Sequence, residues 1–493
     1  RWVDLGLGTI SPIRDDAGNV QLRIFTRLDE PQYKISPYKE LFTDKEIERL
    51  ETDGHLGSTK KMKDFTSGRE CECYVSVHEA TNRLTTLPVD ALTLPTRIYG
   101  KEIGDDIEAL RIGMYNKVQE GPTYYSYIAF DLFGGELMTS TGRPIDLINS
   151  LSNALHTFVS SQWNGYYKAL LQVNNVMSIA EGLADSPTRN RVLGECRYFR
   201  AYIYLCLVTR FGDVPVLRQN TQAKVSRDPA SMAWELVEED LDAASGFLNG
   251  LSADSFYYVS PAAVTALKAR VKLYLGKKGE AKELAESLIA NPNYALDDFD
   301  KIFRSKANKE VIFAFSCLTE DGSSIKISNQ FYSYNHPNKG SYNYRPAGDV
   351  MTMYADNDLR KEVSITTLDN LNFVNKYPSG QTGSDPVVIS RLAEMYLISA
   401  EAQGLNGGLD RLNELREKRG LDRVSPGNEA DFLDAVLQER RLEFLAEGFR
   451  WYDLVRTGKA TQTLGTKDYQ CLMPLPSREL LYNPNLKPNN PGY

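Results

Sequence analysis

Residues 437–459 constrain the fold of this chain more than any other stretch. Leu433, Val436, Leu437 and Phe444 recur at helical spacing and predict a helix. Gly448 predicts the end of that helix or a bend in it, because glycine is unfavourable inside helices and favourable at their ends. Charged and aromatic residues gather around this glycine: Glu439, Arg440, Arg441, Glu443, Glu447, Phe449, Arg450, Trp451, Tyr452, Asp453 and Arg456.

Two interpretations of this stretch compete. In the first, Glu439, Glu443 and Asp453 include a catalytic carboxylate pair. In the second, glutamates and arginines neutralise one another where the helix enters the core, and the aromatic rings pack beside them. Ion-pair networks next to aromatic clusters are mostly architectural, so the sequence favours the second interpretation.

A family resemblance rests on a short set of motifs, in this order: Glu439-Arg440-Arg441, Phe444, Glu447-Gly448, Arg450-Trp451 and Asp453-Leu454. Together they resemble the C-terminal signature of the SusD/RagB family. A second stretch, residues 195–217, predicts a long helix that Gly212 ends and that Pro215 keeps from restarting. Its Glu-x-Arg-x-x-Arg-Ala pattern closing in Phe-Gly-Asp-Val-Pro is very similar to the family's.

Motifs agree with this family in order and spacing over residues 105–493. The resemblance implies a mostly α, SusD-like helical fold with long loops, and it assigns Trp163 and Trp451 to the core. Residues 233–248, 260–275, 280–289, 390–403 and 409–419 predict helices. Their small-against-large pattern resembles tetratricopeptide helix pairs, which stack because one repeat cannot bury its own apolar face.

Residues 1–104 have a different character and predict a small β-rich N-terminal unit of unknown role. Residues 20–28 and 71–78 alternate apolar and polar side chains, as strands do, and residues 15–19 read as a turn. A short helix is predicted over 43–50, capped by Thr43 or Asp44. The resemblance does not cover this unit, so the expected division is 1–104 and 105–493.

Composition excludes several classes of protein. The chain has 57 Lys+Arg against 65 Asp+Glu and a net charge of −8, which disfavours nucleic acid as a partner. No apolar run of about 18 residues is present that would span a membrane. The six cysteines include Cys71 and Cys73, which lie two apart on one face of a predicted strand. No histidine cluster completes a metal site, so we expect buried free cysteines, no metal and no cofactor.

Residues 317–345 form a long polar loop with several aromatic side chains. Such loops are often functional, and aromatic faces with polar edges suit sugar rings. The alternative is that the rings only fix the loop to the helical body. The predicted ligand-binding residues are Tyr332, Tyr334, His336, Tyr342, Tyr344 and Arg345, with Tyr124 and Tyr125 as a second set. Tyr127 and Phe130 are at least as well explained as packing residues, and His336 precedes a proline and reads as a turn residue.

The resemblance implies a lipid-anchored, surface-exposed nutrient-binding protein of the outer membrane, not an enzyme. Its implied partner is a SusC-like TonB-dependent transporter, over which it closes as a lid. The lipid is expected on a cysteine upstream of Arg1. An oligosaccharide is the expected ligand and a peptide is the alternative, while an all-α glycoside hydrolase and a repeat scaffold without a small ligand are weaker hypotheses.

Overall fold

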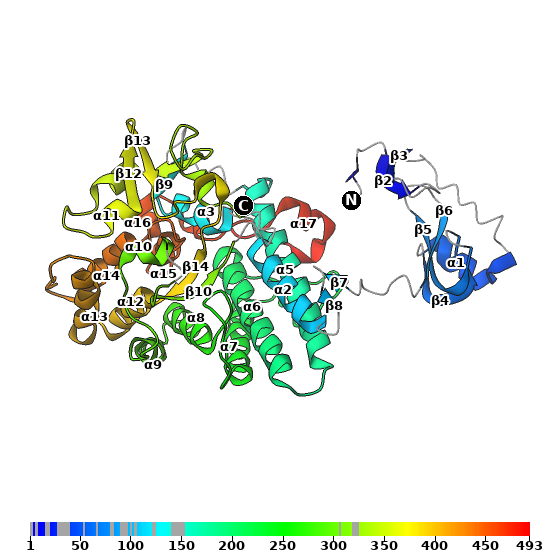
Figure 1. The fold of residues 1–493 in the computed structure, drawn as a ribbon, viewed down its shortest axis with the longest axis horizontal. Helices are drawn as coiled ribbons and strands as arrows, with labels where there is room; N and C mark the ends of the chain where they lie inside the picture. The colour runs from blue at the N-terminus through cyan, green and yellow to red at the C-terminus, as the bar shows by residue number, and fades with distance from the viewer. Residues whose placement is uncertain are drawn as a thin grey trace. The chain divides into compact units, whose positions relative to one another are not determined.

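The computed structural model describes residues 3–4, 8–14, 20–26, 40–52, 55–65, 68–78, 83–88, 97–98, 101–102, 106–120, 125–139, 153–304, 307–317 and 325–493. The chain divides into two units, Arg1–Asp106 and Ile107–Tyr493. The mostly helical fold predicted for the second unit is confirmed (Figure 1). The turn predicted at 15–19 lies outside the described residues.

The first unit contains the predicted strands. Its elements are β1 (Val3–Asp4), β2 (Gly8–Arg14), β3 (Val20–Thr26), α1 (Asp44–Thr52), β4 (His55–Lys63), β5 (Glu70–His78), β6 (Arg83–Pro88), β7 (Arg97–Ile98) and β8 (Lys101–Glu102). Antiparallel sheets run in the orders β1-β2-β3, β4-β5-β6 and β7-β8. Thr43 caps α1 as predicted, because its carbonyl accepts from the Ile47 N–H at 2.9 Å. Leu50, Leu56, Cys73 and Val75 share the small core between α1 and the second sheet.

Paired helices form the body of the second unit, as the packing pattern predicted (Figure 1). The long helices are α2 (Asp106–Glu120), α5 (Thr157–Glu181), α6 (Pro187–Phe211), α7 (Ala230–Phe247), α8 (Pro261–Tyr274), α9 (Lys278–Ile289), α12 (Leu392–Gln403), α13 (Leu405–Lys418) and α14 (Glu429–Glu443). Successive helices pack side by side from α5 to α9, and α12 packs against both α9 and α13. This stacking buries the alanine-rich faces of Ala263, Ala266, Ala269, Ala281 and Ala285.

The central helix α6 shows how local sequence sets the boundaries of an element. Ser186 accepts a hydrogen bond from the Arg189 N–H at 3.2 Å, and Pro187 occupies the first turn, where its missing N–H costs nothing. Gly212 ends the helix at φ 72°. The helix is buried almost all round, and Trp163 of α5 packs edge-on against its Phe211. The core assignment of Trp163 and Trp451, each 4% exposed, is confirmed.

Short elements connect the helices and carry the loops. They are α3 (Tyr125–Phe133), β9 (Leu137–Thr139), α10 (Phe299–Arg304), β10 (Val311–Phe315), β11 (Tyr344–Pro346), α11 (Lys361–Ser364), β12 (Ile365–Leu368), β13 (Leu371–Val374), β14 (Val387–Arg391), α15 (Arg450–Arg456), α16 (Ala460–Leu464) and α17 (Ser477–Tyr482). β10 pairs with β14, β9 with β11, and β12 with β13. The helix predicted from residue 390 begins instead at Leu392, because Ser390 and Arg391 pair with β10.

Candidate functional site

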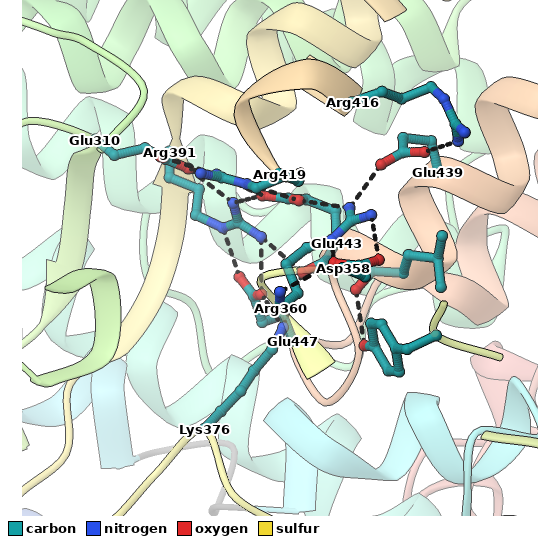
Figure 2. Close-up of polar contacts among 12 residues, drawn as sticks. Glu310, Asp358, Arg360, Lys376, Arg391, Arg416, Arg419, Glu439, Glu443 and Glu447 are labelled. Carbon is teal, nitrogen blue, oxygen red and sulfur yellow. Dashed lines mark hydrogen bonds and ion pairs between the residues drawn. The ribbon is translucent and has the colours of Figure 1, made fainter. Parts of the chain in front are cut away.

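The signature around Glu443 is the centre of a buried charge cluster (Figure 2). Its cations and carboxylates come from six separated parts of the second unit, and nearly all are fully buried. They are Glu310 before β10, Asp358 and Arg360 before α11, Lys376 after β13, Arg391 at the end of β14, Arg416 and Arg419 at the end of α13, and Glu439, Glu443 and Glu447 from α14 and beyond.

Glu443 receives three guanidinium groups. Arg391 lies 2.5 Å from one carboxylate oxygen, Arg419 lies 2.8 Å from the same oxygen, and Arg360 lies 2.9 Å from the other. Burial by itself would raise the pKa of Glu443, but Arg419, Arg391 and Arg360 hold this pKa well below its usual range. Glu443 is therefore ionised and fully occupied as an acceptor, which leaves it no proton to donate.

The neighbouring carboxylates are saturated in the same way. Glu439 accepts from Arg360 at 2.6 Å and from Arg416 at 2.7 Å. Asp453 accepts from Arg440 at 2.7 Å and from Arg456 at 2.8 Å. The side chains of these two acids are at most 2% exposed, so solvent does not reach them. This geometry supports the architectural interpretation of the signature over the catalytic one.

Gly448 redirects the chain between α14 and α15, as the sequence predicted. Its φ is +80°, which a residue with a Cβ adopts only with strain, and its N–H donates to Asp131 Oδ2 at 2.8 Å. The preceding Glu447 accepts from Lys376 at 2.7 Å and from Arg391 at 2.9 Å. The signature thereby joins α3, β14 and the segment after β13 into one rigid support.

The polar loop of residues 325–345 packs against the segment after β13, where the Phe331 ring stacks on that of Tyr377. Tyr332 is 0% exposed, its ring lies 4.4 Å from that of His336, and its hydroxyl donates to Asn375 Oδ1 at 3.1 Å. The His336 ring lies 4.8 Å from that of Phe373, and its Nδ1 accepts from the Asn338 N–H. Tyr332 and His336 are thus packing and turn residues in this structure.

The other end of the loop is also fixed to its neighbours. The Tyr342 ring lies 5.2 Å from that of Phe373, and its hydroxyl donates to the Asn372 carbonyl at 3.0 Å. Tyr344 is 7% exposed and pairs with Thr139 of β9. Arg345 is partly buried and lies beside the Tyr342 hydroxyl. Tyr342 and Arg345 keep partial access to solvent, whereas Tyr344 is packed inside.

Tyr334 differs from all of these residues. Its side chain is 76% exposed, more than that of any other aromatic residue in the described part of the chain. In sequence it lies between buried Tyr332 and partly buried His336, whose rings pack against each other and against Phe373. The exposed or partly exposed polar residues near it in sequence include Ser333, Asn335, Asn338, Lys339, Ser341 and Asn343.

Backbone packing constrains the Tyr334 loop. A Cβ at Gly340 would lie 2.5 Å from the carbonyl oxygens of Asn329 and Tyr332, so only glycine fits there. Lys339 and Tyr342 both have φ of 49°, a strained conformation for such residues that is concentrated at functional sites. The Gln381 N–H donates to the Asn338 carbonyl at 3.1 Å and joins the loop to a second one.

The second predicted set is only partly described. Tyr124 lies outside the described residues, and Tyr125 is the first residue of α3. Tyr127, two residues further along, is 9% exposed, and its hydroxyl donates to the Gln119 carbonyl. This position agrees with the packing role that its sequence context suggested.

The sequence analysis did not identify three residues that contact this loop: Phe373, Asn372 and Asn375. They underlie the Tyr334 loop from the β12–β13 hairpin, about 30 to 40 positions along the chain. The sequence feature that could have indicated them is the dipeptide Asp369-Asn370, which forms the turn of this hairpin and has positive φ at both residues.

Within the described residues, no three His, Cys, Asp or Glu side chains gather as a metal site. No described helix has the length and apolar character to cross a membrane.

Comparison with known proteins identifies the fold. The profile of the SusD family matches residues 370–471, and the profile described as starch-binding associating with outer membrane matches residues 93–275. SusD-like protein P38 of Formosa agariphila is 27% identical over 424 residues, which cover 70% of this chain and 82% of that protein.

Two solved structures share the architecture. A SusD superfamily protein from Bacteroides vulgatus matches with a TM-score of 0.69 at 22% identity, over 79% of this chain and 99% of that one. Surface glycan-binding protein A from Bacteroides thetaiotaomicron, solved in complex with laminarihexaose, matches with a TM-score of 0.67 at 18% identity, over 78% and 99%. The two profiles and the Formosa relative support assignment of the chain to the SusD/RagB family, and the solved structures show that it shares the SusD-like fold.

Proposed function

We propose that this protein is a cell-surface binding protein that captures an oligosaccharide and delivers it to a SusC-like TonB-dependent outer-membrane transporter. The observation that carries the proposal is the exposed Tyr334 ring on its fixed loop. A flat ring with a polar edge stacks on the apolar face of a sugar, and the neighbouring amide groups supply hydrogen bonds to its hydroxyls. Because the loop is already constrained, it loses less conformational entropy when a ligand binds.

The relatives support a glycan as the ligand. The structural neighbour from Bacteroides thetaiotaomicron holds laminarihexaose, and one of the matching profiles is described as starch-binding. We accordingly place Tyr334 at the centre of the ligand surface, with Tyr342 and Arg345 at its edge. Tyr332, His336 and Tyr344 support this surface from beneath, and the roles of Tyr124 and Tyr125 stay as predicted from the sequence.

A ligand screen tests the proposal. Purified protein is titrated calorimetrically with a panel of β-glucan, starch and other plant or algal oligosaccharides, and in parallel with a panel of peptides. We expect saturable binding of at least one oligosaccharide, with no reducing ends released. Binding of peptides alone would favour the peptide alternative, and release of shorter sugars would favour a glycoside hydrolase.

Delivery to a transporter extends the proposal to the cell. We propose that a lipid on a cysteine upstream of Arg1 holds the protein at the outer membrane, where the Tyr334 loop faces the transporter. A photo-crosslinker at position 334 is then expected to capture a large outer-membrane barrel in the native cell. Crosslinks that never include a barrel would contradict the delivery model while leaving the ligand screen unaffected.

A further inference from the structure

Three sulfur atoms gather inside the first unit. The Sγ atoms of Cys71 and Cys73 on β5 lie 3.6 Å apart. Met62 of β4 lies directly opposite Cys71 in the antiparallel register. Opposite residues project from the same face of a sheet with their Cβ atoms about 5 Å apart, so the thioether and the two thiols share one site.

This site is enclosed but not sealed. Cys73 is 0% exposed and Met62 is 6% exposed, and both belong to the small core that α1 covers. Cys71 is partly exposed at the rim of that core. A small ion therefore has access past Cys71 and would then be surrounded by apolar side chains.

The sulfur spacing suits one shared metal ion. Two thiolates that each bind a metal at about 2.3 Å lie at most about 4.6 Å apart, so a separation of 3.6 Å allows both to bind the same ion. The two cysteines are not joined by a disulfide, whose sulfurs would lie about 2.05 Å apart. Thiolate and thioether donors together select soft ions, of which Cu(I) is the main biological example.

The charged groups beside this site are Lys60 and Glu46, which already pair with each other. Two thiolates with one Cu(I) carry a net charge of −1, which is unfavourable in an apolar core without a cation. Lys60 lies opposite Cys73 in the register, and its Nζ contacts Glu46 at 2.8 Å and lies 5.4 Å from the centre of the Phe42 ring. Its ammonium group is therefore held on the face of the sheet that carries the sulfurs.

We propose that Cys71, Cys73 and Met62 bind one Cu(I) ion in the N-terminal unit. On binding, each thiol loses its proton to solvent and each thiolate donates an electron pair to the metal. The copper arrives already reduced, so no electron is transferred. The spacing Cys-x-Cys by itself indicated only buried thiols, because the third donor comes from a neighbouring strand whose register the sequence does not reveal.

The test is a competition titration of the reduced, full-length protein with Cu(I) against a coloured Cu(I) chelator, without oxygen. We expect the protein to withhold about one equivalent of copper and to show sulfur-to-copper charge-transfer absorption. Cys71→Ser is expected to abolish this binding. Met62→Leu, which keeps the core filled, is expected to weaken it by about tenfold or more, since even losses outside the ligand set cost 10–100-fold. Cys471→Ser, a partly exposed cysteine of the second unit, is the matched control and is expected to bind as the wild type.

A second measurement uses only the wild-type protein, so its result does not depend on whether a variant folds. Cys71 is partly exposed and is expected to react with iodoacetamide in the metal-free protein, and one equivalent of Cu(I) is expected to protect it. The proposal is overturned if the reduced protein withholds no copper, if Cys71→Ser binds copper as the wild type does, or if Cu(I) leaves alkylation of Cys71 unchanged.

Discussion

At the scale of single residues, Glu443 connects three arginines of the buried charge cluster. It is 0% exposed and accepts from Arg360, Arg391 and Arg419, which come from three different segments. Removal of its charge leaves three buried cations with too few carboxylates. One glutamate thereby couples the loop before α11, the end of β14 and the end of α13.

We predict that Glu443→Gln lowers the free energy of unfolding by about 3–5 kcal/mol, because it strands buried arginines. Chemical denaturation of the purified variant measures this change. Glu417→Gln, which breaks only an exposed pair with Arg423, is the control and should change stability by less than about 1 kcal/mol. A Glu443→Gln protein with unchanged stability but lost ligand binding would assign the signature to the ligand site.

Glu136 makes stability depend on pH. Burial raises its pKa from 4.5 to about 7, against the opposing effect of Arg441 and Arg450. Asp131 beside it has a pKa that burial and Glu136 raise as well. Between pH 4.5 and 7 the folded protein therefore holds a proton at Glu136 that the unfolded chain has released, so this residue's contribution to stability falls as pH rises.

Between pH 4.5 and 7, the titration of Glu136 should lower the free energy of unfolding of the wild type by up to about 1.4 kcal/mol per pH unit. We predict that Glu136→Gln removes this decrease. Urea unfolding of wild type and variant from pH 5 to pH 8 measures the difference between the two curves. The variant should gain stability relative to the wild type as pH rises. Parallel curves would show that Glu136 has an ordinary pKa in the folded protein.

At the scale of elements, helices could be predicted and their long-range partners could not. Gly212 ends α6 as predicted, whereas the helix begins at Pro187, before the predicted stretch of residues 195–217. By contrast, Glu439 and Glu443 were expected to pair with nearby arginines, yet they bind Arg360, Arg391, Arg416 and Arg419. Contacts over 20 to 80 residues depend on how helices stack, which local patterns do not encode.

The Tyr334 loop shows the same limit. Tyr332 and Tyr344 were ligand-binding candidates because they lie in a polar loop, whereas Phe373 and β9 supply the core that buries them. Tyr334 was one of several equal candidates, and only its exposure distinguishes it. A polar loop sequence therefore does not reveal which of its rings faces solvent.

We predict that Gly340→Ala distorts this loop. The new methyl group would lie 2.5 Å from two backbone oxygens, so it should lower both stability and oligosaccharide affinity. Gly246→Ala in α7, where nothing lies within 4 Å, is the control and should stabilise the protein by about 0.5–1 kcal/mol. Calorimetric titration and thermal melting of both variants test this. Full affinity in Gly340→Ala would mean that the loop does not form the ligand surface.

At the scale of the whole molecule, the two units are expected to have separate roles. The alignments include 99% of each of these solved structures but only 78–79% of this chain. The folds of those two proteins are therefore complete without an additional unit of about 100 residues. We predict that a protein beginning at Asp105 folds and binds oligosaccharide with the affinity of the full chain. Calorimetry on both proteins measures this, and a folded but inactive truncation would place part of the ligand site in the first unit.

The central claim is that an exposed ring on a fixed loop captures the sugar, and one pair of variants tests it most directly. Tyr334→Ala and Tyr482→Ala each remove an exposed tyrosine, 76% and 57% exposed, and only the first lies on the loop. Calorimetric titration with the best oligosaccharide should show Tyr334→Ala weakened by at least about 1 kcal/mol, roughly fivefold in Kd. Tyr482→Ala should bind as the wild type, and both should melt as the wild type does. Equal affinity in the two variants would contradict the account.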